Sequence, residues 1–175
     1  MSLQTVGTER GDLDREKRFL ATHAAGHDRI YRYFRRRTEN AATAEDLCAE
    51  VFRITWEKTA HNESLSVMVL FGIAKNVLRN HDRSAVRSAS LLGALRLERN
   101  HDSSDDESPI RDALSQLGPE DREVLLLTYW DGFSSNEVSD LLNTSATAVR
   151  MRLHRARKAL SRLLRTDAQP EGAER

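Results

Sequence analysis

Apolar residues along this chain recur at helical spacing, and no segment shows the sustained alternation that predicts a β-strand. The clearest case is the stretch from Ser145 to Arg165. Its apolar residues recur at i, i+4, i+7, i+11 and i+14, which places them on one buried stripe of a helix. These residues are Val149, Leu153, Ala156, Leu160 and Leu163. The pattern predicts an all-α fold.

Capping signals predict a second helix directly before this one. Ser134 and Glu137 form the S-x-x-E pattern of a capping box. Asn143 can adopt the left-handed conformation that ends a helix, and Ser145 is a suitable N-cap for the next helix. Two helices joined by a tight polar turn predict a helix-turn-helix within residues 110–165.

A helix from Pro119 to Tyr129 is expected to support this pair. Proline is favoured at a first helical position, and the helix is expected to stop at Asp131-Gly132. Its expected core positions are Val124, Leu125, Leu127 and Tyr129.

Helical periodicity also predicts three helices in the N-terminal half. They run from Leu13 to Arg37 with a break near Gly26, from an N-cap at Thr43, and from Leu65 to Arg83. Polar residues between the second and third helices predict a loop.

Composition divides the chain into two small helical domains. Residues 89–109 are rich in Ser, Asp and Asn and end in HDSSDDESP, which is typical of a flexible, solvated acidic linker. We therefore expect an N-terminal domain over residues 13–88 and a C-terminal domain over residues 110–165. Disordered tails are expected at residues 1–12 and 166–175.

The distribution of charge points to nucleic acid, although the formal net charge is zero. Seven Lys or Arg residues and no Asp or Glu lie between Ser145 and Arg165, whereas residues 102–123 contain eight Asp or Glu. A neutral average therefore conceals one strongly basic helix. A solvated basic face, or a surface for an acidic protein, is the alternative that charge alone leaves open.

The start of this basic helix carries the candidate base-reading residues. Arg150, Met151, His154 and Arg155 are expected to point outward where a recognition helix meets base edges. Arginine can bond guanine with two hydrogen bonds, and methionine can touch a thymine methyl group. The other candidates for DNA contact are Ser145 and Thr147 at the helix start, and Arg152, Arg157 and Lys158, placed for phosphate.

Other chemistries find little support. The single cysteine, Cys48, excludes an intramolecular disulfide, fits a reducing cytoplasm and lies on an apolar helix face. His23 and His27 lack companion ligands, so we predict no metal site.

No catalytic triad, carboxylate pair or phosphate-binding loop can be assembled, which predicts a protein that is not an enzyme and has no cofactor. No apolar run reaches the roughly 20 residues of a membrane span, and no signal peptide is visible, so we expect a cytoplasmic protein.

The C-terminal segment LGPEDREVLLLTYWDGFSSNEVSDLLNTSATAVRMRLHRARKAL resembles region 4 of bacterial sigma factors. AEDLCAEVF and FGIAKNVLRNHDRS resemble consecutive parts of region 2. Their order and spacing resemble the extracytoplasmic-function (ECF) type. This resemblance implies a protein that binds core RNA polymerase and promoter DNA, directs transcription initiation, and is regulated by an anti-sigma protein.

The resemblance also implies roles for individual residues. The basic helix would read the −35 element. The implied core polymerase-binding residues are Glu45, Asp46, Leu47, Glu50, Val51 and Phe52. The implied −10 element-binding residues are His61, Asn62, Asn76, Arg79 and Arg83. Residues 102–107 would pass through the RNA path of the polymerase. Each of these roles has a simpler alternative. The acids near residue 45 could only offset a helix dipole, the loop with His61 and Asn62 could be an ordinary helix connection, and residues 102–107 could be a plain solvated linker.

Some positions depart from the family pattern and leave the promoter sequence open. Ala49 replaces a usual Gln, Val69 a common Trp, and Asn80 a common Asp. Asn143 replaces Gly, and Thr147-Ala148 replaces Gly-Thr. Two other functions remain to be distinguished: a helix-turn-helix regulator that is not a polymerase subunit, and a polymerase-docking adaptor that does not bind DNA.

Overall fold

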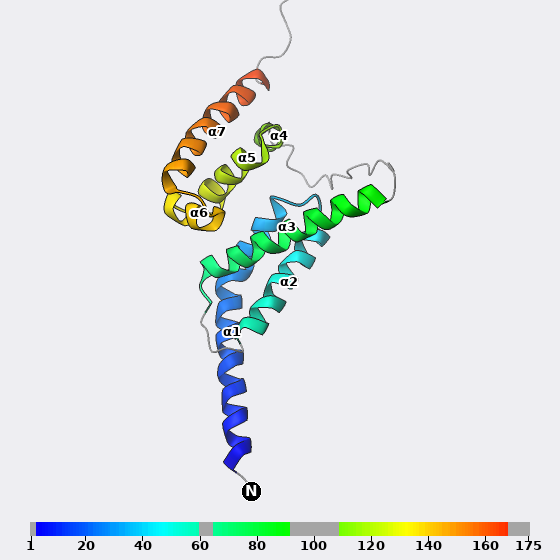
Figure 1. Cartoon of the computed structure of the whole chain (residues 1–175), viewed down its shortest axis with the longest axis vertical. Coiled ribbons are helices and arrows are strands. Elements are labelled where there is room, and N and C mark those ends of the chain that lie inside the picture. Colours follow the sequence, from blue (N-terminus) through cyan, green and yellow to red (C-terminus); the bar gives the residue numbers. More distant parts are fainter. Residues whose placement is uncertain (1–2, 60–64, 92–108, 168–175) are drawn as a thin grey trace, which may run out of the picture. The chain divides into compact units, whose positions relative to one another are not determined.

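The computed structural model describes residues 3–59, 65–91 and 109–167, and the regular structure within these ranges is entirely helical (Figure 1). The all-α prediction is therefore confirmed. The chain divides into two compact units, Met1–Asp102 and Ser103–Arg175, which we call unit 1 and unit 2. Most of the predicted acidic linker lies outside the described residues.

Unit 1 contains three helices that pack against one another pairwise: α1 (Leu3–Arg35), α2 (Ala41–Thr59) and α3 (Val67–Leu91). Each helix contributes at least one side chain that is fully buried. Ile30 and Phe34 come from α1, Val51 from α2, and Leu70 and Phe71 from α3. The shared apolar core fixes how the outer faces of these helices are oriented.

Helix α1 differs from the predicted helix in two places, the N-terminal tail and the break expected near Gly26. It begins at Leu3, so residues 3–12 are helical rather than a loose tail. It also continues through Gly26, where an added Cβ would collide with the side chain of Leu70. Gly26 therefore allows a close approach between α1 and α3. The first proline is Pro109, so nothing in α1 forces a break.

The N-terminus of α2 is capped by Asn40 rather than by Thr43. The Asn40 side-chain oxygen accepts a hydrogen bond from the Thr43 backbone N–H at 2.8 Å. Thr43 lies inside the helix, which begins at Ala41. The correction follows from the capping geometry, because an N-cap side chain bonds to the backbone of the second or third helical residue.

Helix α3 is longer than expected. Its buried apolar side chains include Leu70, Phe71 and Ala74. The helix continues to Leu91, past the expected domain boundary at residue 88. No proline or glycine stands between residues 84 and 91 to stop it.

Unit 2 is built around α7 (Ala146–Asp167), which packs against α4 (Pro109–Ser115), α5 (Pro119–Leu125) and α6 (Ser135–Leu142). Because α7 runs to Asp167, it also extends past the expected start of the C-terminal tail at residue 166. Val124, Leu125, Val138, Val149 and Ala156 are almost completely buried. Three short helices thus hold one long helix by its apolar stripe.

A π-helical turn, η1 (Leu126–Trp130), follows α5 and was not predicted. The Asp131 N–H donates to the Leu126 carbonyl at 3.0 Å, which is the i→i+5 bond of this geometry. Tyr129 is 53% exposed and Trp130 is 40% exposed. The expected core position of Tyr129 is therefore wrong, because the wider turn rotates its side chain away from the core.

The predicted turn between α6 and α7 is confirmed in detail. Ser134 and Glu137 form the reciprocal capping box. Asn143 ends α6 with φ 50°, in the left-handed region. The Ser145 hydroxyl accepts a hydrogen bond from the Ala148 N–H at 3.1 Å and so caps α7. Local hydrogen bonds thus fix where α7 starts.

Candidate nucleic-acid and protein interfaces

The outer face of α7 brings together most of the residues predicted to contact DNA. Val149 and Leu153 face the core and are 1% and 6% exposed. The opposite face therefore carries a set of exposed side chains: Thr147, Arg150, Met151, His154, Arg155, Arg157 and Lys158. Met151 is 63% exposed on this face.

Hydrogen bonds within α7 give its first turn a defined arrangement. The Arg150 Nη2 atom donates to the Thr147 hydroxyl at 3.2 Å. The Ser145 hydroxyl is occupied in capping the helix. Arg157 lies further along, where its Nε atom donates to the Leu153 carbonyl at 3.4 Å. Arg150, Met151, His154 and Arg155 therefore follow directly on a capped first turn that also exposes Thr147.

Arg152 is placed differently from the other predicted phosphate contacts. Its Nη2 atom lies 2.6 Å from Glu120 Oε2, so the side chain is turned toward α5. The Arg152 side chain is 34% exposed. An arginine that is held in an ion pair is not freely available to phosphate, so its assignment as a phosphate contact loses support.

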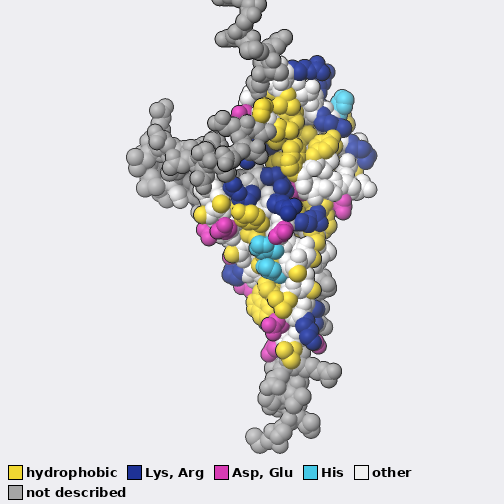
Figure 2. Space-filling model, turned by 180° about the vertical axis from the view of Figure 1, so that it is seen from behind, with side chains coloured by type: hydrophobic (Ala, Val, Ile, Leu, Met, Phe, Trp, Pro, Cys, Tyr) yellow, Lys and Arg dark blue, Asp and Glu magenta, His cyan; other side chains and the backbone are white. Residues whose placement is uncertain are grey.

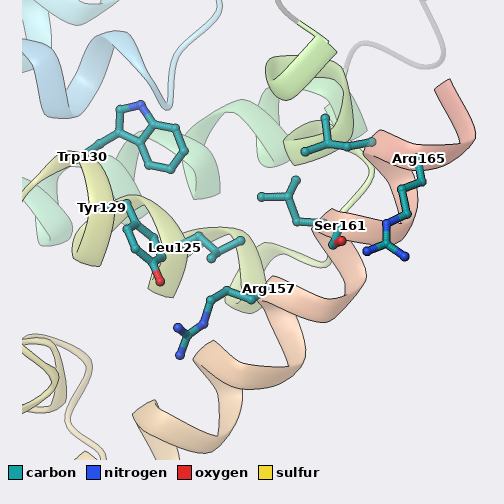
Figure 3. Close-up of a pocket in the computed structure, with 8 residues that line it drawn as sticks. Leu125, Tyr129, Trp130, Arg157, Ser161 and Arg165 are labelled. Atoms are coloured by element: carbon teal, nitrogen blue, oxygen red, sulfur yellow. The ribbon is translucent and has the colours of Figure 1, made fainter. Parts of the chain in front are cut away.

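An apolar groove lies beside this face and was missed in the sequence. Figure 3 shows Leu125, Tyr129 and Trp130 on one side, with Arg157, Ser161 and Arg165 of α7 on the other. Leu160 and Leu164 complete the lining. In the space-filling view, apolar side chains gather in an open patch bordered by Lys and Arg side chains (Figure 2). The aromatic pair Tyr129-Trp130, just before Asp131-Gly132, was the available signal.

The predicted protein-binding face of α2 separates into exposed acids and buried apolar side chains. Glu45 and Asp46 are exposed. Glu50 is held by Arg53, whose Nε and Nη2 atoms donate to the carboxylate at 2.7 Å each. These hydrogen bonds, and the charge of Arg53, lower the pKa of Glu50. Arg53 is also paired with Glu57, which leaves Glu45 and Asp46 as the more accessible carboxylates.

Leu47, Val51 and Phe52, which the family resemblance groups with the polymerase contacts, are 9%, 0% and 6% exposed, because they lie on the side of α2 that packs within unit 1. They hold α2 so that Glu45 and Asp46 face outward. A direct contact of these three residues with polymerase stays a prediction.

The residues predicted to bind a melted DNA strand are only partly placed. Asn76, Arg79 and Arg83 are exposed on α3, and the Arg79 Nη2 atom donates to the Asn76 side-chain oxygen at 3.0 Å. His61 and Asn62 lie outside the described residues. The structure therefore brings together the three α3 residues, and the connecting segment stays a prediction.

A second groove lies between α1 and α2 in unit 1. It is lined by His23, His27, Tyr31, Glu45, Cys48, Ala49 and Phe52. The rings of His23 and Phe52 lie 4.5 Å apart between centroids, and burial followed by the nearby His27 lowers the pKa of His23. Within the described residues, no three His, Cys, Asp or Glu side chains group as metal ligands. The two histidines are thus part of an aromatic cluster.

Sequence comparison identifies the family. Residues 108–160 match the family model described as Sigma-70, region 4. The ECF RNA polymerase sigma factor SigL of Mycobacterium tuberculosis is 30% identical over 145 residues, which cover 75% of this chain and 80% of SigL. This chain belongs to the ECF sigma factors. Sigma factors of this family direct RNA polymerase to promoters.

Two further relatives match this sigma factor over different shares of their own length. The RNA polymerase sigma factor CarQ of Myxococcus xanthus is 30% identical over 164 residues, covering 88% of this chain and 91% of CarQ. The ECF RNA polymerase sigma factor BldN of Streptomyces coelicolor is 30% identical over 154 residues. That match covers 81% of this chain but only 58% of BldN.

Solved structures support the fold. The sigma factor RpoE of Bartonella quintana, solved in complex with the anti-sigma factor NepR, has a TM-score of 0.65 and 22% identity. The match covers 88% of this sigma factor and 98% of RpoE. CnrH, solved with the cytosolic domain of CnrY, has a TM-score of 0.64 and 23% identity, covering 85% and 88% of the two chains.

The departures from the family pattern lie at the surface of this sigma factor. Ala49 is exposed beside Glu45 in the α1–α2 groove, and Val69 is 40% exposed on α3. Asn80 and Asn143 are also exposed. None of these substitutions disturbs the core.

Each helix in the described part of the chain is too short or too polar to cross a bilayer.

Proposed function

We propose that this sigma factor reads the −35 element with the exposed face of α7 and docks on core RNA polymerase with the acidic face of α2. The single observation that carries the proposal is the arrangement of the N-terminal half of α7. There a capped helix presents Arg150, Met151 and Arg155 outward while its apolar stripe is held by α4, α5 and α6.

The chemistry of α7 suits the major groove. An α-helix fits that groove, and its first turns reach the base edges. Arg150 and Arg155 can each donate two hydrogen bonds to guanine, and Met151 can contact a thymine methyl group. His154 completes this surface, and Lys158 lies where phosphate contacts are expected.

The chemistry of α2 suits a basic protein surface. Glu45 and Asp46 are exposed, and the buried side chains of Leu47, Val51 and Phe52 fix the direction in which they point. Complementary charge favours the correct orientation and rapid association with a basic partner. We therefore place the polymerase contact on the acids of α2.

The −10 element is proposed to meet α3. Asn76, Arg79 and Arg83 give this helix an exposed polar and basic surface. Cations that follow a strand backbone, beside polar groups that bond an unstacked base, are what single-strand capture requires. His61 and Asn62 remain part of this proposal.

The protein is proposed to act without catalysis of its own and in the cytoplasm, where RNA polymerase works. An anti-sigma protein, implied by the family resemblance, is proposed as a further partner. Co-purification from unstressed cells tests it, and recovery of the free sigma factor alone would count against it.

Run-off transcription with core polymerase over a genomic promoter library tests the main function. We expect a set of start sites that appears only when the full-length chain is added. Start sites that are the same with and without the chain would refute the proposal. DNA binding without such transcripts would favour a separate helix-turn-helix regulator, and polymerase binding without DNA binding would favour an adaptor.

Reversing the charge of the α2 acids should weaken docking. We expect the double variant Glu45→Lys/Asp46→Lys to bind core polymerase at least about tenfold more weakly, because close charge pairs across interfaces contribute about 1.5 kcal/mol or more. Asp14→Lys, which changes an exposed acid of α1, is the control. Titration of labelled sigma factor with core polymerase measures both. Equal affinities for the two variants would move the docking site away from Glu45 and Asp46.

A further inference from the structure

One cation of α7 is paired across the fold, and the pair joins the recognition helix to the start of α5. Arg152 Nη2 lies 2.6 Å from Glu120 Oε2. Glu120 is in the first turn of α5, directly after Pro119. A carboxylate there is favoured by the positive end of the helix dipole, so the Glu120 position is stabilised before it meets Arg152.

Arg152 lies at the edge of the face that would meet DNA. It precedes buried Leu153 and is three residues, about 60° around the helix, from buried Val149. Its side chain is 34% exposed, whereas its neighbours Arg150 and Met151 are exposed. Helix geometry therefore places Arg152 beside the apolar stripe, on the side where α5 packs.

The carboxylate of Glu120 changes what Arg152 can do. A guanidinium in an ion pair with a carboxylate at this distance has its positive charge offset by the partner, so the pair as a whole is neutral. Glu120 itself is 70% exposed and would repel a DNA phosphate approaching this side of α7. Both effects act against a phosphate contact by Arg152.

We propose that Glu120 keeps Arg152 off the DNA backbone, so that Arg152 positions α7 on α5 instead of binding phosphate. Glu120 is thus a positioning residue that limits sequence-independent affinity. This inference rests on the proposed binding of DNA by α7. Lower non-specific affinity leaves the base-reading residues with a larger share of the total, which raises the ratio of specific to non-specific binding.

The dependence of DNA affinity on salt separates this role from a merely structural one. Each phosphate contact contributes about −0.9 to the slope of log affinity against log salt concentration. The full-length chain is titrated against a random-sequence DNA duplex by fluorescence anisotropy at several salt concentrations. The variants are Glu120→Gln, Arg152→Gln and the double variant, with Asp121→Asn as a control that removes the same charge from the same helical turn.

The expected slopes are distinct. Glu120→Gln should steepen the slope by about 0.9 relative to Asp121→Asn, because the released Arg152 gains a phosphate. Arg152→Gln and the double variant should keep the wild-type slope. A slope that becomes shallower by about 0.9 in Arg152→Gln would overturn the proposal, since Arg152 would then contact phosphate in the native protein. An unchanged slope in Glu120→Gln would also overturn it.

Two controls keep the outcomes separate. Circular dichroism shows whether each variant retains its helices, and Glu120→Gln tests the proposal even if Arg152→Gln destabilises unit 2. Lys158→Ala tests the underlying DNA-binding proposal, because Lys158 is an exposed residue placed for phosphate and phosphate contacts dominate affinity for random-sequence DNA. If Lys158→Ala leaves both the DNA affinity and the salt slope unchanged, the assignment of α7 to DNA fails. If it weakens binding while Glu120→Gln has no effect, only the role of Glu120 fails.

Discussion

Replacing Phe71 with alanine is expected to lower the free energy of unfolding of unit 1 by about 3–5 kcal/mol. Phe71 is 1% exposed, and its ring packs edge-on against Tyr33 with centroids 5.4 Å apart. The change removes a large buried ring and leaves a cavity where α1 meets α3. The total free energy of unfolding of a small domain is about 5–15 kcal/mol, so this change would remove much of the stability of unit 1. Urea unfolding followed by circular dichroism measures the effect.

Val69→Ala is the matched control for this prediction. Val69 is on the same helix but 40% exposed, and a surface substitution of this kind changes stability by only about 0.5 kcal/mol. Similar losses in the two variants would mean that the α1–α3 contact is not the centre of the unit 1 core.

Arg155→Ala is expected to reduce transcription from the preferred promoters by roughly 5- to 150-fold. A bidentate arginine–guanine contact contributes about 1–3 kcal/mol of discrimination, and each 1.4 kcal/mol corresponds to a factor of ten. Run-off transcription from a promoter set with every single-base change in the −35 element measures the loss and its position dependence. The variant should lose its preference at one or two positions only.

Arg165→Ala provides the comparison at the far end of α7. Arg165 is exposed there and lies away from the first turns that reach base edges. As an exposed cation beyond the base-reading turns, Arg165 is placed for phosphate, so its loss should lower output evenly across the promoter set. If Arg155→Ala also lowers output evenly, then Arg155 contacts the backbone and the base-reading role belongs to its neighbours.

Local sequence signals predicted the turn before α7 accurately because each rests on hydrogen bonds between near neighbours. Ser134 with Glu137, Asn143 and Ser145 all behave as their residue types suggest. The apolar stripe of α7 was equally visible, since helical periodicity depends only on spacing within the segment. The exposed base-reading candidates followed directly from that stripe.

Features that depend on distant packing could not be predicted in the same way. The π-helical turn Leu126–Trp130 leaves no periodic signature in so short a helix, and it reversed the expected burial of Tyr129. The pairing of Glu120 with Arg152 depends on how α5 lies against α7. Periodicity within either helix carries no information about that contact.

Helix α2 shows how burial divides the residues of one motif that a family resemblance groups together. Leu47 and Val51 are buried, whereas Glu45 and Asp46 are exposed. The exposed acids are accessible to a partner, and the buried apolar residues orient the helix that carries them.

The buried thiol of Cys48 gives this protein a natural reporter of local opening in unit 1. Cys48 is the single cysteine of the sequence, it is 3% exposed, and burial raises its pKa to about 11. At neutral pH the thiol is therefore protonated. Although Cys48 lines the α1–α2 groove, its surface is almost fully covered, so a thiol-reactive dye should label it mainly when this part of unit 1 opens locally. The labelling rate then reports local opening around Cys48. A cysteine introduced on the surface could therefore be labelled selectively, because Cys48 would react with the dye only slowly.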